Sequence, residues 1–256
     1  MKTIQVNTRY KHMLADIFTP VSIYLRIRDK FPGSILLESA DNQARENSFS
    51  FIGIRPIGGI EITSTNVFEF KYPMEPVERR TMKNPGEMLE HLQAFLHRFQ
   101  FSGKSPVPVT EGMFGYTTYD AVQFFENIQF HAPVNEALAI TLMRYRFYQY
   151  VIAINHFKDE LYLCENQVEG LESEFELLET LIRSKDIPVY PFNKGGEESS
   201  DITNEEYMEL VQKGIQHCHR GDVFQIVLSR SYQQKFNGDE FNVYRALRSI
   251  NPSPYL

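Results

Sequence analysis

Two acidic residues beside apolar stretches are the first candidates for chemistry. Glu38 lies near the end of "ILLES" at 35–39, and Glu111 directly precedes "GMFGY" at 112–116. Two carboxylates held close together could act as a general acid and a general base, but the sequence gives no distance between them. Because exposed carboxylates are the norm, we favour solvated strand ends as the interpretation of both.

Two histidines and two glycines give weaker signals. His217 and His219 are two residues apart at the expected end of a helix, which places them on different faces and argues against a shared metal. As cations they would suit the negative helix terminus. Gly112 and Gly115 are compatible with close backbone approach to a ligand, and equally with a sheet crossing or bulge.

Common catalytic and cofactor motifs are absent from the sequence. It contains no GxGxxG, P-loop, HExxH or GxSxG pattern, and its two cysteines, Cys164 and Cys218, form no CxxC pair. The net charge is −7, with 26 Lys and Arg against 33 Asp and Glu and no long run of one sign. This charge distribution argues against nucleic acid as a partner.

The N-terminal residues and the apolar stretches bear on localisation. The first residues, "MKTIQVNTRYKHML", lack the apolar core of a signal peptide. Stretches such as "YQYVIAI" are far shorter than the roughly 20 residues of a membrane-spanning helix. The sequence therefore predicts no membrane partner and a cytoplasmic location.

Residues 1–192 are predicted to form an α+β domain. With 42% hydrophobic and 13% aromatic residues in 256, the chain can bury a sizeable core. Short strand-like stretches dominate this part, among them "SILLES", "FSFIGI", "GGIEITSTNVFEFKY", "GMFGYTTYD", "LAITLMRYRFYQYVIAI" and "ELYLCEN". We expect an antiparallel sheet core of two packed sheets, covered by helices at 84–99 and 170–184 with apolar residues on one face.

A second, incomplete domain is predicted after a linker at 193–201, "NKGGEESSD". Thr203 and Glu206 form a capping-box pattern for a helix that ends before Gly221. A strand apolar on both faces is expected at 223–228, and a short helix at 240–250 stops before Pro252. One helix, one strand and one short helix cannot enclose a core. Residues 202–256 are therefore predicted to be the start of a larger domain.

The last six residues, "NPSPYL", carry two prolines that fix an extended turn. Turn chemistry alone predicts only the end of a helix here. However, "LLES", "SFSFIGIRP", "EGMFGYTTYDAVQFFE", "GDVFQIVLSRSYQQKF" and "FNVYRALRSINPSPYL" occur in this order and spacing. In these motifs the chain resembles the large subunits of anthranilate synthases along essentially its whole length, most specifically at 207–256.

This resemblance implies a regulatory N-terminal domain followed by the beginning of a truncated chorismate-binding domain. The full-length enzyme of such a family is a lyase of tryptophan biosynthesis, which removes the enolpyruvyl group of chorismate and aminates the ring. It uses Mg²⁺ and ammonia from a glutamine amidotransferase subunit, component II. Members continue for about as many residues again, and their catalytic histidine and Mg²⁺-binding glutamates lie there. No catalytic or metal-binding residue is therefore expected in this chain, which should be inactive alone.

The resemblance also implies feedback inhibition by L-tryptophan. Its effector site would comprise Glu38, Ser39, Arg45, Pro254, Tyr255 and Leu256. Glu38 and Ser39 offer polar partners for a zwitterionic head group, and Tyr255 and Leu256 offer an apolar slot for an indole. Arg45 is the nearest basic residue after "LLES", whereas Ser48 stands in the register where relatives often have a basic residue.

Two alternatives remain open. Aminodeoxychorismate synthase shares the fold and differs mainly by a catalytic lysine in the part of the enzyme beyond 256. The glutamate of "LLES" and the unbroken "SFSFIG" favour anthranilate synthase. The other alternative is a non-catalytic module that senses an amino acid or binds a subunit.

Overall fold

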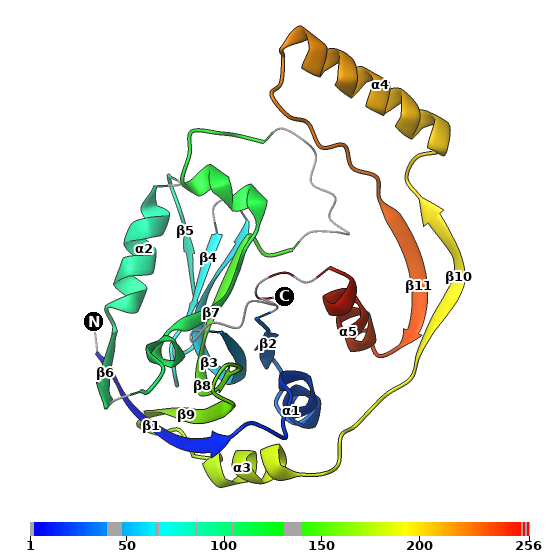
Figure 1. Ribbon diagram of the computed structural model, residues 1–256. Coiled ribbons are helices and arrows are strands. Elements are labelled where there is room, and N and C mark those ends of the chain that lie inside the picture. Colours follow the sequence, from blue (N-terminus) through cyan, green and yellow to red (C-terminus); the bar gives the residue numbers. More distant parts are fainter. Residues whose placement is uncertain are drawn as a thin grey trace. The chain divides into compact units, whose positions relative to one another are not determined.

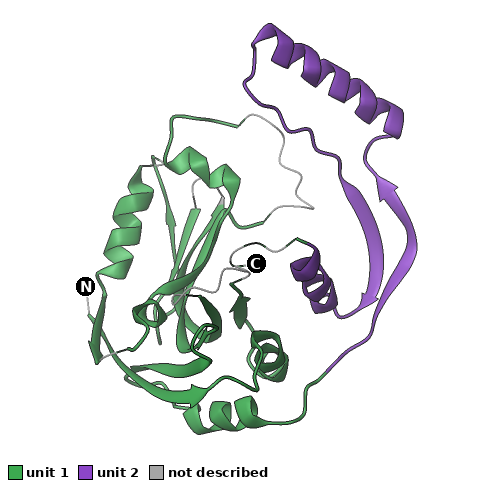
Figure 2. Cartoon of the chain, viewed as in Figure 1, with its two compact units in different colours: residues 1–188, 251–256 green, residues 189–250 purple. Residues whose placement is uncertain are grey.

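The computed structural model describes residues 3–39, 48–64, 67–84, 86–103, 105–130, 140–251, 253 and 255. Figure 2 shows the two compact units into which the chain divides. Unit 1 comprises residues 1–188 and 251–256, and unit 2 comprises residues 189–250. Each unit is considered separately below.

A nine-stranded sheet forms the centre of unit 1 (Figure 1). Its strands are β1 (Ile4–Leu14), β2 (Ile35–Leu37), β3 (Phe49–Ser64), β4 (Val67–Lys71), β5 (Glu78–Thr81), β6 (Phe99–Gly103), β7 (Met113–Thr117), β8 (Met143–Asn155) and β9 (Glu160–Val168). The main order is β5-β4-β3-β8-β9-β1-β6, with β2 pairing with β3 and β7 with β8. Only the β1–β6 pair among these described strands is parallel.

The two longest strands, β3 and β8, pair with each other along most of their length. They pair from Phe49 opposite Asn155 to Ile62 opposite Met143, with an irregularity between Pro56 and Gly58. Bulges bend a strand and increase its twist. The expected α+β class and antiparallel sheet are confirmed, but the prediction of two packed sheets is wrong. The bulge interrupts the apolar pattern of β3. The sequence of this one long strand therefore looks like two short strands, which led to the prediction of two sheets.

The helices of unit 1 cover different parts of the sheet. They are α1 (Pro20–Ile27), α2 (Glu87–Leu96) and α3 (Phe175–Arg183), with short 3-10 helices η1 (Pro108–Glu111) and η2 (Tyr119–Phe124). Ile23 and Ile27 of α1 and Leu178 and Ile182 of α3 are fully buried in one core with side chains of β3, β8 and β9. The sequence patterns do not predict α1, although Thr19 caps it by accepting a hydrogen bond from Ser22 N.

Helix α2 covers a second core. Met88 and Phe95 are buried there together with Phe68 and Phe70 of β4. The helix predicted to start at Asn84 begins three residues later. None of the helices in the described ranges is long and apolar enough to cross a membrane.

Unit 2 consists of a two-stranded sheet and two helices. Its elements are β10 (Phe192–Ser200), α4 (Asn204–Arg220), β11 (Tyr232–Gly238) and α5 (Phe241–Ile250). Strands β10 and β11 pair in antiparallel fashion. The predicted linker at 193–201 is therefore corrected, since most of it forms β10. Its partner strand begins more than 30 residues later, so the local composition of glycine, serine and acids gives no sign of the pairing.

Both helices of unit 2 follow the sequence signals. Thr203 Oγ1 accepts from Glu206 N at 3.2 Å, and Glu206 Oε2 accepts from Thr203 N at 2.7 Å, which completes the predicted capping box. Helix α4 ends at Arg220, and the residue that caps it, Gly221, has a φ of 79°, in the left-handed region that glycine adopts without strain. Helix α5 also occupies its predicted position.

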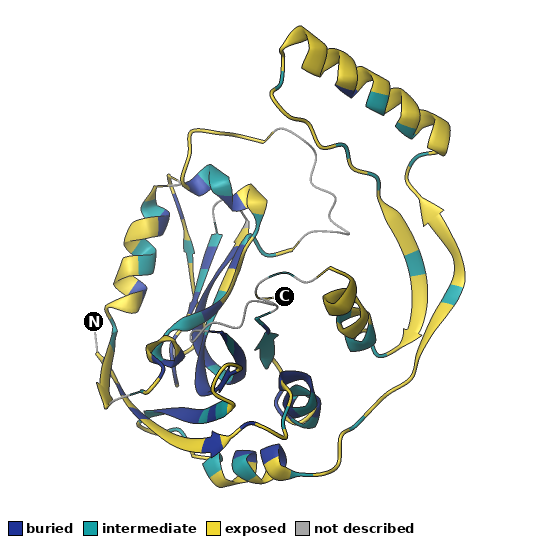
Figure 3. Ribbon diagram, viewed as in Figure 1, coloured by how far each residue is buried: buried dark blue, intermediate teal, exposed yellow. Residues whose placement is uncertain are grey.

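The strand predicted at 223–228 is not formed. This segment is irregular, with Phe224 at 106% and Val227 at 80% relative exposure. Ile226 and Leu228 approach α4 at Gly214, where an added Cβ would lie 3.6 Å and 3.3 Å from their side chains. No described strand pairs with the segment. Figure 3 shows that the elements of unit 2 are largely exposed.

We expect the two units to differ in hydrogen exchange. Amides at 223–228 lack ladder partners and should exchange within about tenfold of unprotected rates, whereas amides at 151–154 in β8 should be among the slowest. Hydrogen-exchange mass spectrometry on dilute monomer measures both segments in one sample. Protection at 223–228 equal to that in β8 would show that this segment forms a paired strand in solution.

The two cysteines should differ in reactivity. Cys164 on β9 is fully buried, and burial raises the pKa of its thiol to about 11, whereas Cys218 on α4 is exposed. Since the thiolate is the nucleophile, at pH 8 the native protein should react rapidly at one thiol and the denatured protein at two. Titration with a chromogenic disulfide checks this, with Cys218→Ser as the control. A second rapid equivalent in the native protein contradicts it.

Candidate functional site

The residues after β2 meet the start of β3. Ser39 N donates a hydrogen bond to Ser50 Oγ at 3.1 Å, and the hydroxyl oxygens of Ser39 and Ser48 lie 3.3 Å apart. Ser50 is fully buried and Glu38 is only 5% exposed. The interpretation of Glu38 as a solvated strand end is therefore wrong. The pairing of β2 with β3 places this strand end inside the structure, although its own sequence does not show it.

His156, just after β8, completes a polar cluster with these serines. Its Nε2 lies 2.7 Å from Ser50 Oγ, and its backbone N donates to Ser48 O at 3.0 Å. Ser50 thus connects the imidazole to the backbone of Ser39. Sequence reasoning missed both Ser50 and His156. The available signal was a polar residue inside the apolar stretch "SFSFIGI", because a buried hydroxyl requires a hydrogen-bond partner.

The C-terminal residues contact the same strand end. Tyr255 N donates to Glu38 O at 2.8 Å, and the ring centroid of Tyr255 lies 6.5 Å from that of Phe51. The structure thus brings Tyr255 next to Glu38 and Ser39. Of the other expected effector residues, Arg45, Pro254 and Leu256 lie outside the described residues.

Aromatic side chains continue from this contact into the core. Phe51 is stacked on Phe49 with centroids 5.9 Å apart and lies 5.5 Å from Phe114 of β7. Phe51 and Phe114 are buried in a cluster with Val151 of β8. The site therefore combines hydroxyl and backbone groups at Glu38–Ser39 with an aromatic surface at Phe51 and Tyr255. This combination suits a small ligand with one polar and one flat apolar end.

The glycines of "EGMFGY" are explained by the sheet. A Cβ at Gly115 would lie 1.8 Å from Arg144 O, because β7 packs directly against β8 there. A Cβ at Gly112 would lie 3.1 Å from Val109 O in η1. Of the two interpretations of these glycines, the geometry favours the sheet crossing for Gly115.

The remaining candidates do not form a reactive centre. Glu111 belongs to η1, where its charge adds to the burial that raises the pKa of Cys164. His217 Nδ1 lies 2.8 Å from Asp222 Oδ2, to which Arg220 also donates at 2.6 Å. In the part of the chain that the structure describes, no group of three or more His, Cys, Asp or Glu side chains could hold a metal ion.

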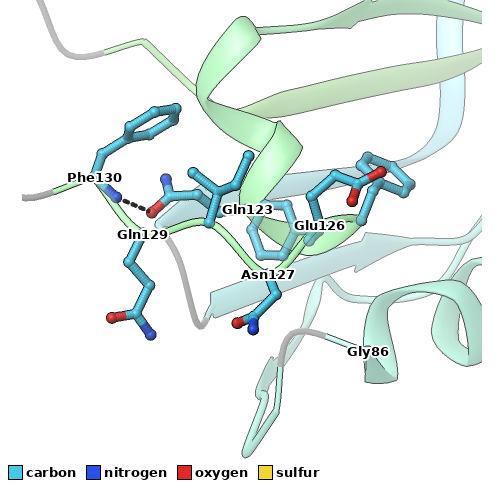
Figure 4. Close-up of a pocket in the computed structure, with 9 residues that line it drawn as sticks. Gly86, Gln123, Glu126, Asn127, Gln129 and Phe130 are labelled. Atoms are coloured by element: carbon cyan, nitrogen blue, oxygen red, sulfur yellow. Dashed lines mark hydrogen bonds between the residues drawn. The ribbon is translucent and has the colours of Figure 1, made fainter. Parts of the chain in front are cut away.

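A separate cavity of about 560 Å³ lies beside the loop after η2. Figure 4 shows Phe130 N donating to Gln123 Oε1, at 3.0 Å. The cavity is lined by Gly86 and residues 123–130. Glu126 is its one titratable lining residue, and the others are amides and apolar side chains, so the lining offers little chemistry.

Comparisons with known proteins place the chain in a family. A family model described as chorismate binding enzyme matches residues 34–256. Anthranilate synthase component 1 of Thermus thermophilus is 31% identical over 253 residues, covering 96% of this chain and 52% of that protein. Its counterpart from Lactococcus lactis is 28% identical, covering 97% of this chain and 54% of that protein.

A solved structure shares the fold. The crystal structure of anthranilate synthase component I from Streptococcus pneumoniae matches with a TM-score of 0.54 and 21% identity, covering 95% of this chain and 53% of that one. The chain thus spans about half the length of the relatives it matches. These matches confirm the resemblance to anthranilate synthase large subunits. Because the family model covers most of its residues, the chain belongs to the chorismate binding enzyme family.

Proposed function

We propose that the chain is the N-terminal half of an anthranilate synthase component 1. In full-length form this subunit would act as a lyase that converts chorismate to anthranilate, the first step of tryptophan biosynthesis. The match to enzymes of that name over nearly the whole chain, at about half of their length, is the observation that carries the proposal. Unit 1, which includes residues 251–256, would be its regulatory part.

The full-length enzyme would need Mg²⁺ and a partner subunit. We propose that component II, a glutamine amidotransferase, supplies ammonia to it. The described residues do not fit a magnesium site, since their acidic and histidine side chains form no group of three. The metal ligands and the catalytic histidine are therefore assigned to the half that the relatives have in addition, and no catalytic step is assigned to this chain.

For this chain we propose effector binding, with L-tryptophan held at Ser39 and Tyr255. The Ser39 hydroxyl would meet the head group of the amino acid, and the rings of Phe51 and Tyr255 would flank the indole. The contact between Tyr255 N and Glu38 O supports this placement, because it joins the two sequence motifs expected to form the site. Arg45, Pro254 and Leu256 remain its expected further members.

Effector binding at this place offers a route to inhibition. Residues 251–256 follow directly on α5 of unit 2, so a ligand that stabilises the contact at Glu38 restrains the chain as it leaves that unit. A ligand can shift an equilibrium only through its different affinities for two states. The state with the Tyr255–Glu38 contact formed would be the one that tryptophan binds.

A non-catalytic sensing module is the second candidate function. Its support is the hydrophobic core that unit 1 forms from its own residues. Both candidates bind an amino acid, and they differ in whether a catalytic half exists. Aminodeoxychorismate synthase receives less support, because the curated relatives quoted above are anthranilate synthase subunits.

This chain alone should not turn over chorismate. With chorismate, Mg²⁺ and ammonium salt, anthranilate fluorescence should stay at the level of a no-enzyme control, because the described residues provide no acid cluster for the metal. A full-length anthranilate synthase serves as the positive control. Mg²⁺-dependent anthranilate formation by this chain contradicts the proposed division of labour between the halves.

Free L-tryptophan should bind to this chain. The protein has no tryptophan of its own, so selective excitation of indole reports the ligand alone. Its emission should shift to the blue on entering the aromatic slot, and Ser39→Arg should weaken binding at least about tenfold by filling the site and opposing the ligand's ammonium group. Ser199→Arg on the exposed strand β10 is the matched control.

Three outcomes distinguish the claims. A blue shift lost in Ser39→Arg and kept in Ser199→Arg supports the site. A shift that survives Ser39→Arg means that tryptophan binds elsewhere, and the site assignment fails while the family stands. No shift at saturating folded protein removes effector binding from the proposed function.

A further inference from the structure

A second cavity of about 560 Å³ lies over β3, β4 and β8 in unit 1. It shares no residue with the site at Glu38, Ser39 and Tyr255, and it is lined by an unusual number of charged side chains. These are Glu61, Glu69, Lys71, Arg144 and Arg146. Gly33, Ser34, Ile35, Pro56, Val77 and Tyr148 complete the wall.

The strand register gathers these residues on one face. Successive even positions of β8 carry Arg144, Arg146 and Tyr148, and alternate residues of a strand point to the same side. Arg144 pairs with Glu61 in the β3–β8 ladder. A Cβ at Gly59 would lie 2.9 Å from the Arg146 Cδ atom, so this glycine leaves room for the Arg146 side chain.

The charges of the cavity do not balance. Glu61 is 8% exposed, accepts a hydrogen bond from Arg146 and forms an ion pair with Arg144, whose Nε lies 3.0 Å from Glu61 Oε1. Glu69 pairs with Arg79 at 2.7 Å. Lys71 forms no ion pair with any described residue. Two carboxylates therefore face three lining cations, and burial lowers the pKa of Arg146.

The floor of the cavity adds a buried donor. Tyr148 is 1% exposed, and its hydroxyl forms no hydrogen bond with another side chain or backbone group in the described ranges. Burial raises the pKa of this phenol, so it stays protonated and can donate. The ring is held in place against Gly53, where a Cβ would lie 2.8 Å from it. Because Tyr148 lines the cavity, its hydroxyl can donate a hydrogen bond to an acceptor bound there.

From these observations we infer that the cavity binds a small carboxylate with a compact apolar body. The carboxylate would accept hydrogen bonds from Arg146 and the Tyr148 hydroxyl and face the ammonium group of Lys71. The apolar body would lie against Ile35 and Val77. Arginine favours carboxylates because its planar group donates two parallel hydrogen bonds. This binding activity lies beyond the proposed function and does not depend on it.

Benzoate is the probe, with benzamide as its neutral counterpart and inorganic phosphate as an anion without an apolar body. The full chain is labelled with tyrosine carrying ¹³C at the ζ position, and Tyr148→Phe assigns the Tyr148 resonance. At low ionic strength, benzoate should shift this resonance in a saturable way, whereas benzamide should not. Calorimetry then gives the affinity of each variant.

The variants separate a specific site from general charge attraction. Arg146→Met and Tyr148→Phe should each weaken benzoate binding, the former about tenfold or more. Arg183→Met on α3 removes the same charge from a residue outside the cavity lining and should leave the affinity unchanged. Tyr148→Phe keeps the packed ring and removes only the hydroxyl. It therefore tests the proposed carboxylate site even if Arg146→Met does not fold.

The inference is overturned by several results. These are the absence of a saturable benzoate shift, affinity kept in Tyr148→Phe, or equal weakening in Arg183→Met. Phosphate binding more tightly than benzoate overturns the carboxylate class.

Discussion

The pairing of β3 with β8 is the constraint on which both candidate sites depend. These strands pair over nearly their whole lengths, and a bulge between Pro56 and Gly58 divides the pairing into two segments. Because side chains alternate along a strand, a slip of one residue would turn every side chain to the opposite face. The register before the bulge places Ser50 near His156, and the shifted register after it places Glu61 opposite Arg144. A change at the bulge would therefore alter the register of one site relative to the other.

Burial on the two sides of this pair shows how one ladder serves several cores. Ile52 and Ile152 face the core under α1 and α3, whereas Phe51 and Val151 face the aromatic cluster that reaches Tyr255. The ligand-facing groups are thus attached to strands that are packed on both sides. Packing on both sides of the strands limits the movement of the side chains in a site and reduces the conformational entropy that is lost when a ligand binds.

Local signals in the sequence predicted local structure well. The capping box at Thr203 and the glycine at 221 set the ends of α4 through contacts within a few residues, and the structure has them. The failures concern partners distant in sequence. Residues 193–200 are a strand because of β11, and 223–228 are not a strand because no described strand pairs with them. Ser50 and His156 are 106 residues apart and meet only through strand register.

The path of the chain gives the Tyr255–Glu38 hydrogen bond a further meaning. The chain leaves unit 1 after residue 188 and rejoins it at residue 251, so unit 2 is inserted between two segments of unit 1. The Tyr255–Glu38 hydrogen bond lies in the segment that rejoins unit 1. Closing a flexible loop costs entropy that grows only with the logarithm of its length, about 0.6 kcal/mol for each doubling. Residues could therefore be added to or removed from the loops of unit 2 with little effect on whether Tyr255 returns to Glu38. The need to form the Tyr255–Glu38 hydrogen bond therefore constrains the loop lengths of unit 2 only weakly.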